Sequence, residues 1–131
     1  MAEEFDDDAL AFAAQLFDLA REGHSEQLVD YLEHGLSPDL TNSKGDTLLL
    51  LAAYYNHPDT VRALLAHGAD TERVNDRGQT PLAAAVFRQS AASVAALVAA
   101  GADPSLGDPN ALATATFFEL PDMLALLPAT R

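Results

Sequence analysis

Apolar residues gather in short runs along the chain, and polar turns separate these runs in a regular order. A loop that contains Gly leads to Thr, a favoured N-cap residue, and an apolar run follows over 48–55 and again over 81–88. After a short break, a second run covers 58–66 and 91–99 and ends near Gly, which adopts the left-handed conformation after a helix at no steric cost. The pattern predicts pairs of short helices.

This order of elements repeats every 33 residues. Gly35, Gly68 and Gly101 stand at that spacing. When residues 42–74 are laid over 75–107, twelve of the 33 aligned positions are identical. Self-similarity at a fixed period of this length is typical of a repeat protein, in which stacked units share one continuous core.

The units at the two ends depart from the repeat. The first helix is expected to start after the acids Asp6 to Asp8, which suit a helix N-terminus, to break at Gly23 and to restart at Ser25. The last unit has lost three loop residues and is expected to end near Pro128. We predict a single domain over residues 1–131, with units at about 9–41, 42–74, 75–107 and 108–131.

Composition favours helices throughout the chain. The 131 residues include 26 Ala and 21 Leu but no Ile, and Ala and Leu are strong helix formers and weak strand formers. A chain of this length can bury roughly two-thirds of its unfolded surface, which is enough for a core. The expected fold is therefore all-α.

The segments LLAHGAD (64–70) and DRGQTPLAAA (76–85) resemble the repeat of the ankyrin family, and the resemblance covers roughly residues 9–127. It implies an all-α ankyrin-repeat solenoid of about four helix-turn-helix units, in which two full repeats lie between an N-terminal and a C-terminal capping unit. The family pattern Thr-Pro-Leu-His is changed to Thr-Leu-Leu-Leu (47–50) and Thr-Pro-Leu-Ala (80–83). Apolar packing is thus expected in place of the family's Thr–His hydrogen bond. The whole chain also resembles the small stand-alone ankyrin proteins of actinobacteria, which implies a bacterial source.

The net charge of −13, with only seven Lys and Arg, changes the expected class of partner. A protein that neutralises phosphates needs clustered basic residues, so we expect no nucleic acid and no membrane as a partner. The acidic start of the chain lacks the basic and apolar regions of a secretory signal, which favours the cytoplasm. The absence of Cys excludes a disulfide framework, a Cys-based zinc site and a thiol nucleophile.

The sequence offers few candidates for a catalytic or metal-binding site. The chain has no Gly-x-Ser-x-Gly motif, no phosphate-cradling Gly loop and no His-Glu-x-x-His motif, so we expect no enzyme and no cofactor. The His residues form two pairs 33 apart, His24 with His57 and His34 with His67, and equivalent positions in stacked units lie about 10 Å apart. That is too far to share a zinc ion at its ~2 Å ligand distance. The acids at Glu3, Glu4 and Asp6 to Asp8 lack the spaced oxygens and turn Gly of a calcium loop. No metal site is expected.

Aromatic residues recur at the ends of the first helices, where the aligned pairs are Arg21-Glu22, Tyr54-Tyr55, Phe87-Arg88 and Phe117-Phe118. In ankyrin proteins these positions look onto the concave surface beside the loop tips. Adjacent helical residues differ by about 100° in direction, so we expect Tyr54, Phe87 and Phe117 to be partly packed and Tyr55, Arg88 and Phe118 to be more exposed. The predicted partner-binding residues are Lys44, Asp46, Tyr54, Tyr55, Arg77, Gln79, Phe87, Arg88, Phe117 and Phe118.

Two functions follow as hypotheses. In the first, the protein is a monomeric, non-catalytic scaffold that binds a segment of another protein on its concave face, because aromatic and Arg side chains are enriched at binding surfaces. In the second, it is an acidic inhibitor or immunity-type protein. Residues 1–33 carry ten acids and one Arg, and would present a negative surface to a basic target.

Overall fold

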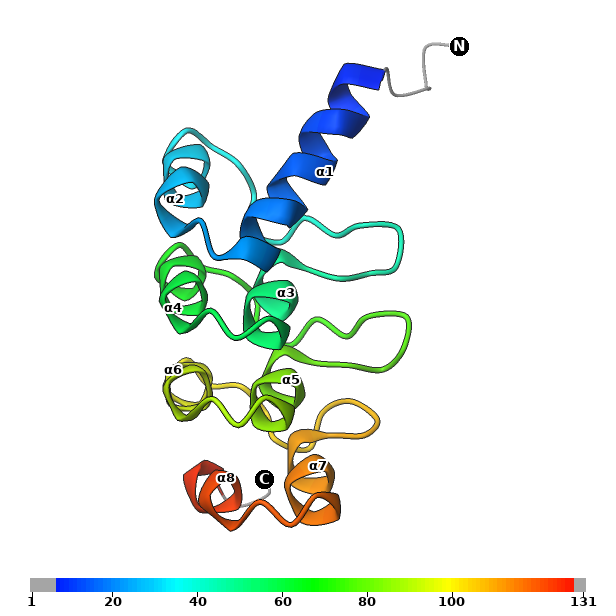
Figure 1. Cartoon of the computed structure of the whole chain (residues 1–131), viewed down its shortest axis with the longest axis vertical. Helices are drawn as coiled ribbons and strands as arrows, with labels where there is room; N and C mark the ends of the chain where they lie inside the picture. The colour runs from blue at the N-terminus through cyan, green and yellow to red at the C-terminus, as the bar shows by residue number, and fades with distance from the viewer. Residues whose placement is uncertain (1–6, 129–131) are drawn as a thin grey trace.

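A computed structural model describes residues 7–128 of the chain, and these residues form eight helices in four antiparallel pairs (Figure 1). The helices are α1 (Asp7–Glu22), α2 (Ser25–Glu33), α3 (Leu48–Tyr54), α4 (Pro58–Ala66), α5 (Pro81–Phe87), α6 (Ala91–Ala99), α7 (Ala111–Phe117) and α8 (Pro121–Leu126). The predicted all-α fold is confirmed. The predicted helices over 48–55 and 81–88 each end one residue earlier than expected, and those over 58–66 and 91–99 have the predicted bounds.

The pairs stack along one axis and form two layers (Figure 1). The first helices of the pairs, α1, α3, α5 and α7, contact one another in series, and the second helices form a parallel series beside them. The loops that join consecutive pairs project from the first layer, on the side away from the second helices. No helix within residues 7–128 is long and apolar enough to cross a bilayer.

Local sequence explains where the repeated helices begin. Thr47 and Thr80 have extended backbone conformations and their hydroxyls accept hydrogen bonds from the amides of Leu50 and Ala83, at 3.0 and 3.1 Å. These bonds satisfy amides that the first turn of a helix leaves unpaired. The predicted N-caps are confirmed.

The core consists of the apolar residues that recur at the 33-residue spacing. Val61 and Val94, like Leu64 and Leu97, are fully buried in successive units. Leu50 and Ala83, which occupy the place of the family's His, are only 3% and 7% exposed. The expected apolar burial at that place is confirmed.

Candidate functional site

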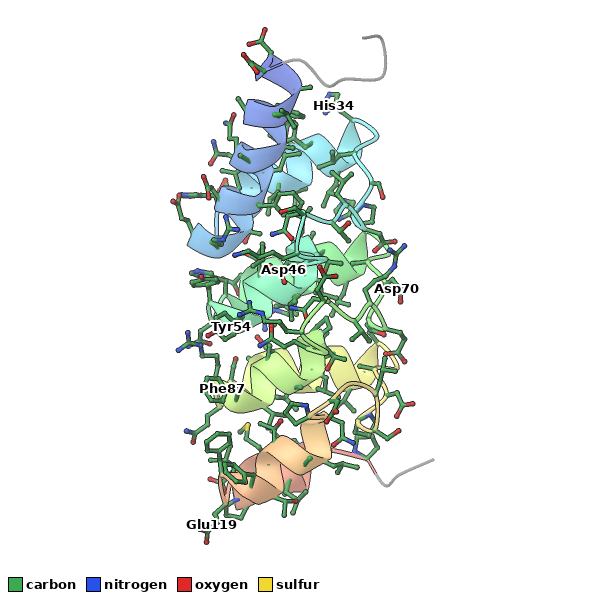
Figure 2. The ribbon with its side chains drawn as sticks, turned by 90° about the vertical axis from the view of Figure 1, so that its right-hand side faces the viewer. His34, Asp46, Tyr54, Asp70, Phe87 and Glu119 are labelled. Carbon is green, nitrogen blue, oxygen red and sulfur yellow. The ribbon has the colours of Figure 1, made fainter. Side chains whose placement is uncertain are left out.

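Five aromatic side chains form a continuous ladder along the edge of the stack. The Tyr54 and Phe87 rings stack 6.5 Å apart, and Phe87 meets Phe118 edge-on at 5.5 Å. Tyr55 and Phe117 extend the row, each packed edge-on against its neighbour in the sequence. Figure 2 shows Tyr54 and Phe87 one below the other on the edge opposite Asp70. The structure thus joins three units through what we call the aromatic ladder.

The expected division of each pair into a packed and an exposed residue is right for one pair only. Tyr54 is half-buried while Tyr55 is 43% exposed, as expected. Phe87 and Phe117 were expected to be partly packed, but they are 45% and 79% exposed, and Phe118 at 49% is less exposed than Phe117. The reason is that Phe118 turns toward Phe87, while no following unit within the described residues covers Phe117.

Arg88 joins the ladder from the side. Its guanidinium carbon lies 4.7 Å from the centroid of the Tyr54 ring, within cation–π range, and its Nε donates a hydrogen bond to the Tyr54 carbonyl oxygen. Arg88 is exposed, as expected, and one of its donors is engaged with the preceding unit, where it steadies Tyr54.

Two adjoining hollows form a groove between the projecting loops and the first helices. The apolar hollow has a volume of about 250 Å³ and is lined by Tyr54, Gln79, Ala83, Ala84, Phe87, Pro109, Thr114 and Phe118. The polar hollow, of about 380 Å³, is lined by Ala14, Phe17, Asp18, Arg21, Asn42, Ser43, Lys44, Asp46, Leu50, Leu51, Tyr54, Tyr55, Arg77 and Gln79. Eight of the ten predicted residues line this groove, and Arg88 and Phe117 lie outside it.

Asp46 makes its contacts within the protein. Its side chain is buried at 6% exposure, and its two carboxylate oxygens accept hydrogen bonds from the side-chain amides of Asn42 and Asn75, at 3.2 and 2.8 Å. Asp46 was predicted to be a partner-binding residue; it lines the polar hollow, but both of its carboxylate oxygens are engaged within the protein. The carboxylate ties one projecting loop to the next, because its place at the loop base faces the neighbouring repeat.

Asn42 and Asn75 were not singled out from the sequence. The Asn75 side-chain oxygen accepts from the backbone amides of Arg77 and Gln79, and its amide also donates to the Gln79 side chain at 2.8 Å. The side-chain oxygen of Asn42 likewise accepts hydrogen bonds from the backbone amides of Lys44 and Asp46. The signal that could have found them is the 33-residue spacing of two Asn residues just ahead of the loop tips.

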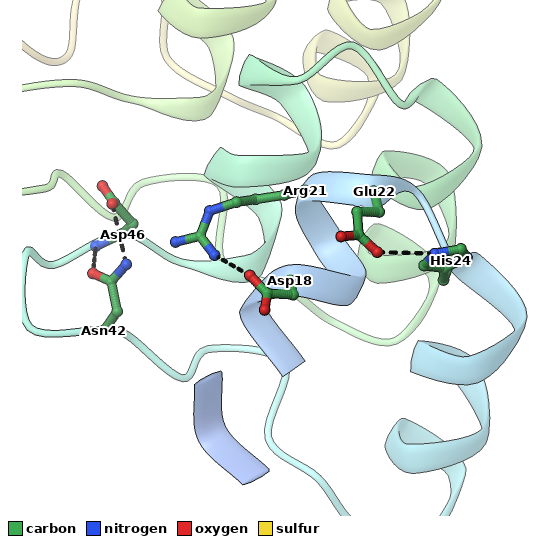
Figure 3. Close-up of polar contacts among 6 residues, drawn as sticks. All are labelled: Asp18, Arg21, Glu22, His24, Asn42 and Asp46. Atoms are coloured by element: carbon green, nitrogen blue, oxygen red, sulfur yellow. Dashed lines mark hydrogen bonds and ion pairs between the residues drawn. The ribbon is translucent and has the colours of Figure 1, made fainter. Parts of the chain in front are cut away.

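The first helix contributes one further groove residue that was not singled out from the sequence, Asp18, which lies beside Arg21 of the first aligned pair. Asp18 and Arg21 lie one turn apart on α1 and form an ion pair of 2.8 Å at the wall of the polar hollow (Figure 3). The nearby His24 ring donates to the Glu22 carboxylate at 3.1 Å. Because α1 belongs to the atypical end unit, the repeat pattern gave no reason to place Asp18 in the groove.

The His residues take up separate structural positions. The His57 Nε2 donates to the Arg21 carbonyl oxygen at 2.7 Å and so links two units. His34 and His67 each donate through Nδ1 to the carbonyl four residues earlier. At His34 this backbone hydrogen bond and the charge of Asp30 raise the pKa of the imidazole. Within residues 7–128 no group of three His, Asp or Glu side chains is placed to hold a metal ion.

The acidic N-terminal cluster is described only in part. Asp7 and Asp8 are exposed in the first turn of α1, where carboxylates complement the positive end of the helix dipole. Asp6, with Glu3 and Glu4, lies outside the described residues.

Comparison with known proteins agrees with the geometry. Residues 10–108 match the family model for ankyrin repeats in three copies. The chain is also similar to a curated ankyrin repeat protein of Pseudomonas aeruginosa, with 54% identity over 59 residues. The match covers 45% of this chain and 34% of that protein, so the similarity spans about a third of this relative's length. The likeness to actinobacterial proteins stays a prediction.

Proposed function

The chain belongs to the ankyrin repeat family, and we propose that it is a non-catalytic scaffold which binds an extended segment of a partner protein in the groove beside the aromatic ladder. Ankyrin repeats are protein–protein interaction domains, which is the general part of this function. The finer part is that the aromatic ladder and the groove beside it carry the affinity.

The aromatic ladder is the observation that carries the proposal. Its rings are large and mostly exposed, yet each is in contact with another ring, so the free protein already holds them in a defined arrangement. Binding energy concentrates in a few such anchors. A preformed surface also loses less side-chain entropy on binding than a flexible one.

The loops on the other side of the groove are equally well ordered. Backbone hydrogen bonds link successive loops, from the Asp76 amide to the Lys44 carbonyl at 3.0 Å and from the Asp108 amide to the Gly78 carbonyl at 2.9 Å. With the buried Asp46 carboxylate between two Asn amides, they form a rigid wall. A rigid groove of this kind favours recognition of an extended segment, because little of its own conformational entropy is lost on binding.

The test compares truncations on two surfaces of the molecule. Tyr55→Ala and Phe118→Ala should each weaken binding of the captured natural partner by about tenfold or more, since losses of ~2 kcal/mol are common at anchors and 1.4 kcal/mol is one decade. The matched control is Phe12→Ala, because Phe12 is 40% exposed and packs against Tyr31 on the first pair, away from the groove. Calorimetry with the isolated partner measures the affinities.

The alternative hypothesis, an acidic inhibitor, predicts that the acidic N-terminal residues carry the affinity. Neutralising Asp6, Asp7 and Asp8 together should leave the affinity nearly intact at ~0.15 M salt, where exposed charges are screened beyond about 8 Å. If this triple variant loses binding while Phe118→Ala retains it, the protein acts as an inhibitor of a basic target and the groove proposal is wrong.

A further inference from the structure

The apolar hollow has the size and lining of a site for one side chain. Three rings line it, those of Tyr54, Phe87 and Phe118, with Ala83 and Ala84 along its α5 side. Its volume of about 250 Å³ is below the ~300–1,000 Å³ that is usual for small-molecule pockets. A single large apolar residue of a peptide, seated among the rings, is the occupant that this lining fits.

The polar hollow carries an excess of positive charge, which is unusual in a chain of net charge −13. Its two carboxylates are already engaged, Asp18 with Arg21 at 2.8 Å and Asp46 with two side-chain amides. Lys44 and Arg77 are exposed at equivalent loop tips, and their side chains form no ion pair with other residues in the described part of the chain. The cations are therefore available to an acidic group.

Most of the protein's net negative charge lies in the first 33 residues, outside the loops that carry Lys44 and Arg77. Residues 1–33 carry a net charge of −9, and residues 34–131, which include both loop tips, carry only −4. At ~0.15 M salt the screening length is about 8 Å, which limits the effect of the distant acids on a ligand in the groove. Charge complementarity thus favours an acidic residue beside Lys44 and Arg77.

The two hollows are offset by about one repeat. They share Tyr54 and Gln79; the polar hollow reaches α1 and the apolar hollow reaches α7. Packed helices lie about 8–10 Å apart, and an extended chain advances ~3.3–3.6 Å per residue. An extended segment therefore spans the offset in about three residues.

From these observations we infer that the groove selects an acidic and apolar peptide motif: a large apolar residue in the hollow of the rings and, about three positions away, Asp or Glu between Lys44 and Arg77. This inference rests on the proposed function and names the chemistry of the partner segment. It also predicts that a basic segment is rejected.

Selection from random peptides tests the motif directly. The full chain is immobilised and used to select from phage-displayed dodecapeptides, and the enriched sequences are synthesised with a fluorescein label. Enriched peptides should combine an aromatic or large aliphatic residue with Asp or Glu about three positions away. Replacing that acid by Lys should weaken binding about tenfold or more in fluorescence anisotropy, and the difference should shrink at ~0.5 M salt, where screening is stronger.

A charge reversal on the protein provides the matched control. Arg77→Glu should weaken the acidic peptides about tenfold, and Lys44→Glu with Arg77→Glu should reverse the preference toward the peptide that carries Lys. Arg62→Glu makes the same change of charge on α4, where Arg62 is exposed and lines neither hollow, and it should leave the affinity unchanged. Lys44 and Arg77 engage their loops through backbone atoms, so both variants should melt like the parent protein.

The outcomes separate this inference from the proposed function. If the selected peptides lose affinity in Phe118→Ala but bind Arg77→Glu as tightly as the parent protein, the groove is the binding surface and the acidic motif is wrong. If they bind Phe118→Ala and Arg77→Glu equally tightly, both the inference and the groove proposal are wrong.

Discussion

Two equivalent hydroxyl groups in successive units have different surroundings. Thr60 Oγ1 shares a hydrogen bond of 2.7 Å with Ser25 Oγ of the preceding pair. Ser93 occupies the same position one repeat later, and its hydroxyl is buried without a hydrogen-bond partner among residues 7–128. A buried unpaired polar group costs about 1–3 kcal/mol, so the two positions differ in what the hydroxyl contributes to stability.

Removing each hydroxyl should therefore have opposite effects. Thr60→Val keeps the shape and should lower the free energy of unfolding by about 0.5–1.5 kcal/mol, because Ser25 loses its partner. Ser93→Ala should be neutral or raise the free energy of unfolding by up to about 1 kcal/mol. Chemical denaturation of both variants measures the difference. A larger loss in Ser93→Ala than in Thr60→Val would show that Ser93 has a partner in solution.

Any other residue type at position 68 would have a strained backbone. It follows α4 with φ of +86°, a conformation that β-branched residues strongly disfavour, and an added Cβ would meet no atom within 4 Å. Gly68→Val should thus lower stability by about 1–3 kcal/mol through backbone strain alone. Ser43→Val, an exposed change in a projecting loop, is the control and should shift the denaturation midpoint much less. An unchanged midpoint in Gly68→Val would mean that the helix does not end there.

At the scale of elements, the projecting loops behave as one wall because Asn75 bonds in two directions. Its side chain holds the Arg77 and Gln79 amides within its own loop and donates to the buried Asp46 of the preceding loop. In the described part of the chain, the hydrogen bonds of the Asn42 side chain stay within its own loop. The third inter-unit loop is shorter and contacts the second through the Asp108 amide and Gly78 carbonyl.

Asn75→Ala should consequently destabilise the protein more than Asn42→Ala does. The expected loss is about 1–3 kcal/mol, because the Asp46 carboxylate and two loop amides lose partners. Hydrogen exchange should also speed up at the Arg77 and Gln79 amides in Asn75→Ala. Equal losses in the two variants would indicate that the bond between loops contributes little.

At the scale of the whole molecule, the helix pairs share one continuous core. Each pair contacts its neighbours through both helix layers, and the buried residues run from α1 to α8. Stability in such a stack is a sum of units and of the interfaces between neighbours. A short stack with large interfaces is expected to unfold as one unit.

We accordingly predict a helical monomer that melts in a single cooperative transition, with a melting temperature that a chelator does not change. Circular dichroism with and without chelator measures the transition, and light scattering measures the mass in solution. A fall of many degrees with chelator would reveal a structural metal ion, and a mass of twice the chain would reveal a dimer.

The sequence by itself determined the repeat and its local elements. Thr47 and Thr80 cap their helices through hydrogen bonds to amides three residues further along the chain. Gly68 follows its helix with a positive φ that Gly adopts without strain. Each of these features depends only on residues that are close together in the chain. The 33-residue period then placed Tyr54 and Phe87 in register, because equivalent residues of stacked units lie on the same edge. For this reason eight of the ten residues predicted from the sequence line the groove, although the other residues that line it were not predicted.

Only the tertiary structure decided which of these side chains are exposed and which are buried or bonded within the protein. Asp46 is buried because the amide of Asn75, 29 residues away, reaches it across two loops. Phe118 is more covered than Phe117 because it turns toward a ring of another unit. The division of the groove into an apolar and a charged hollow likewise depends on which side chains pair between units. Contacts of this kind join residues far apart in the chain, and the period of the sequence says where they meet but not which atoms bond.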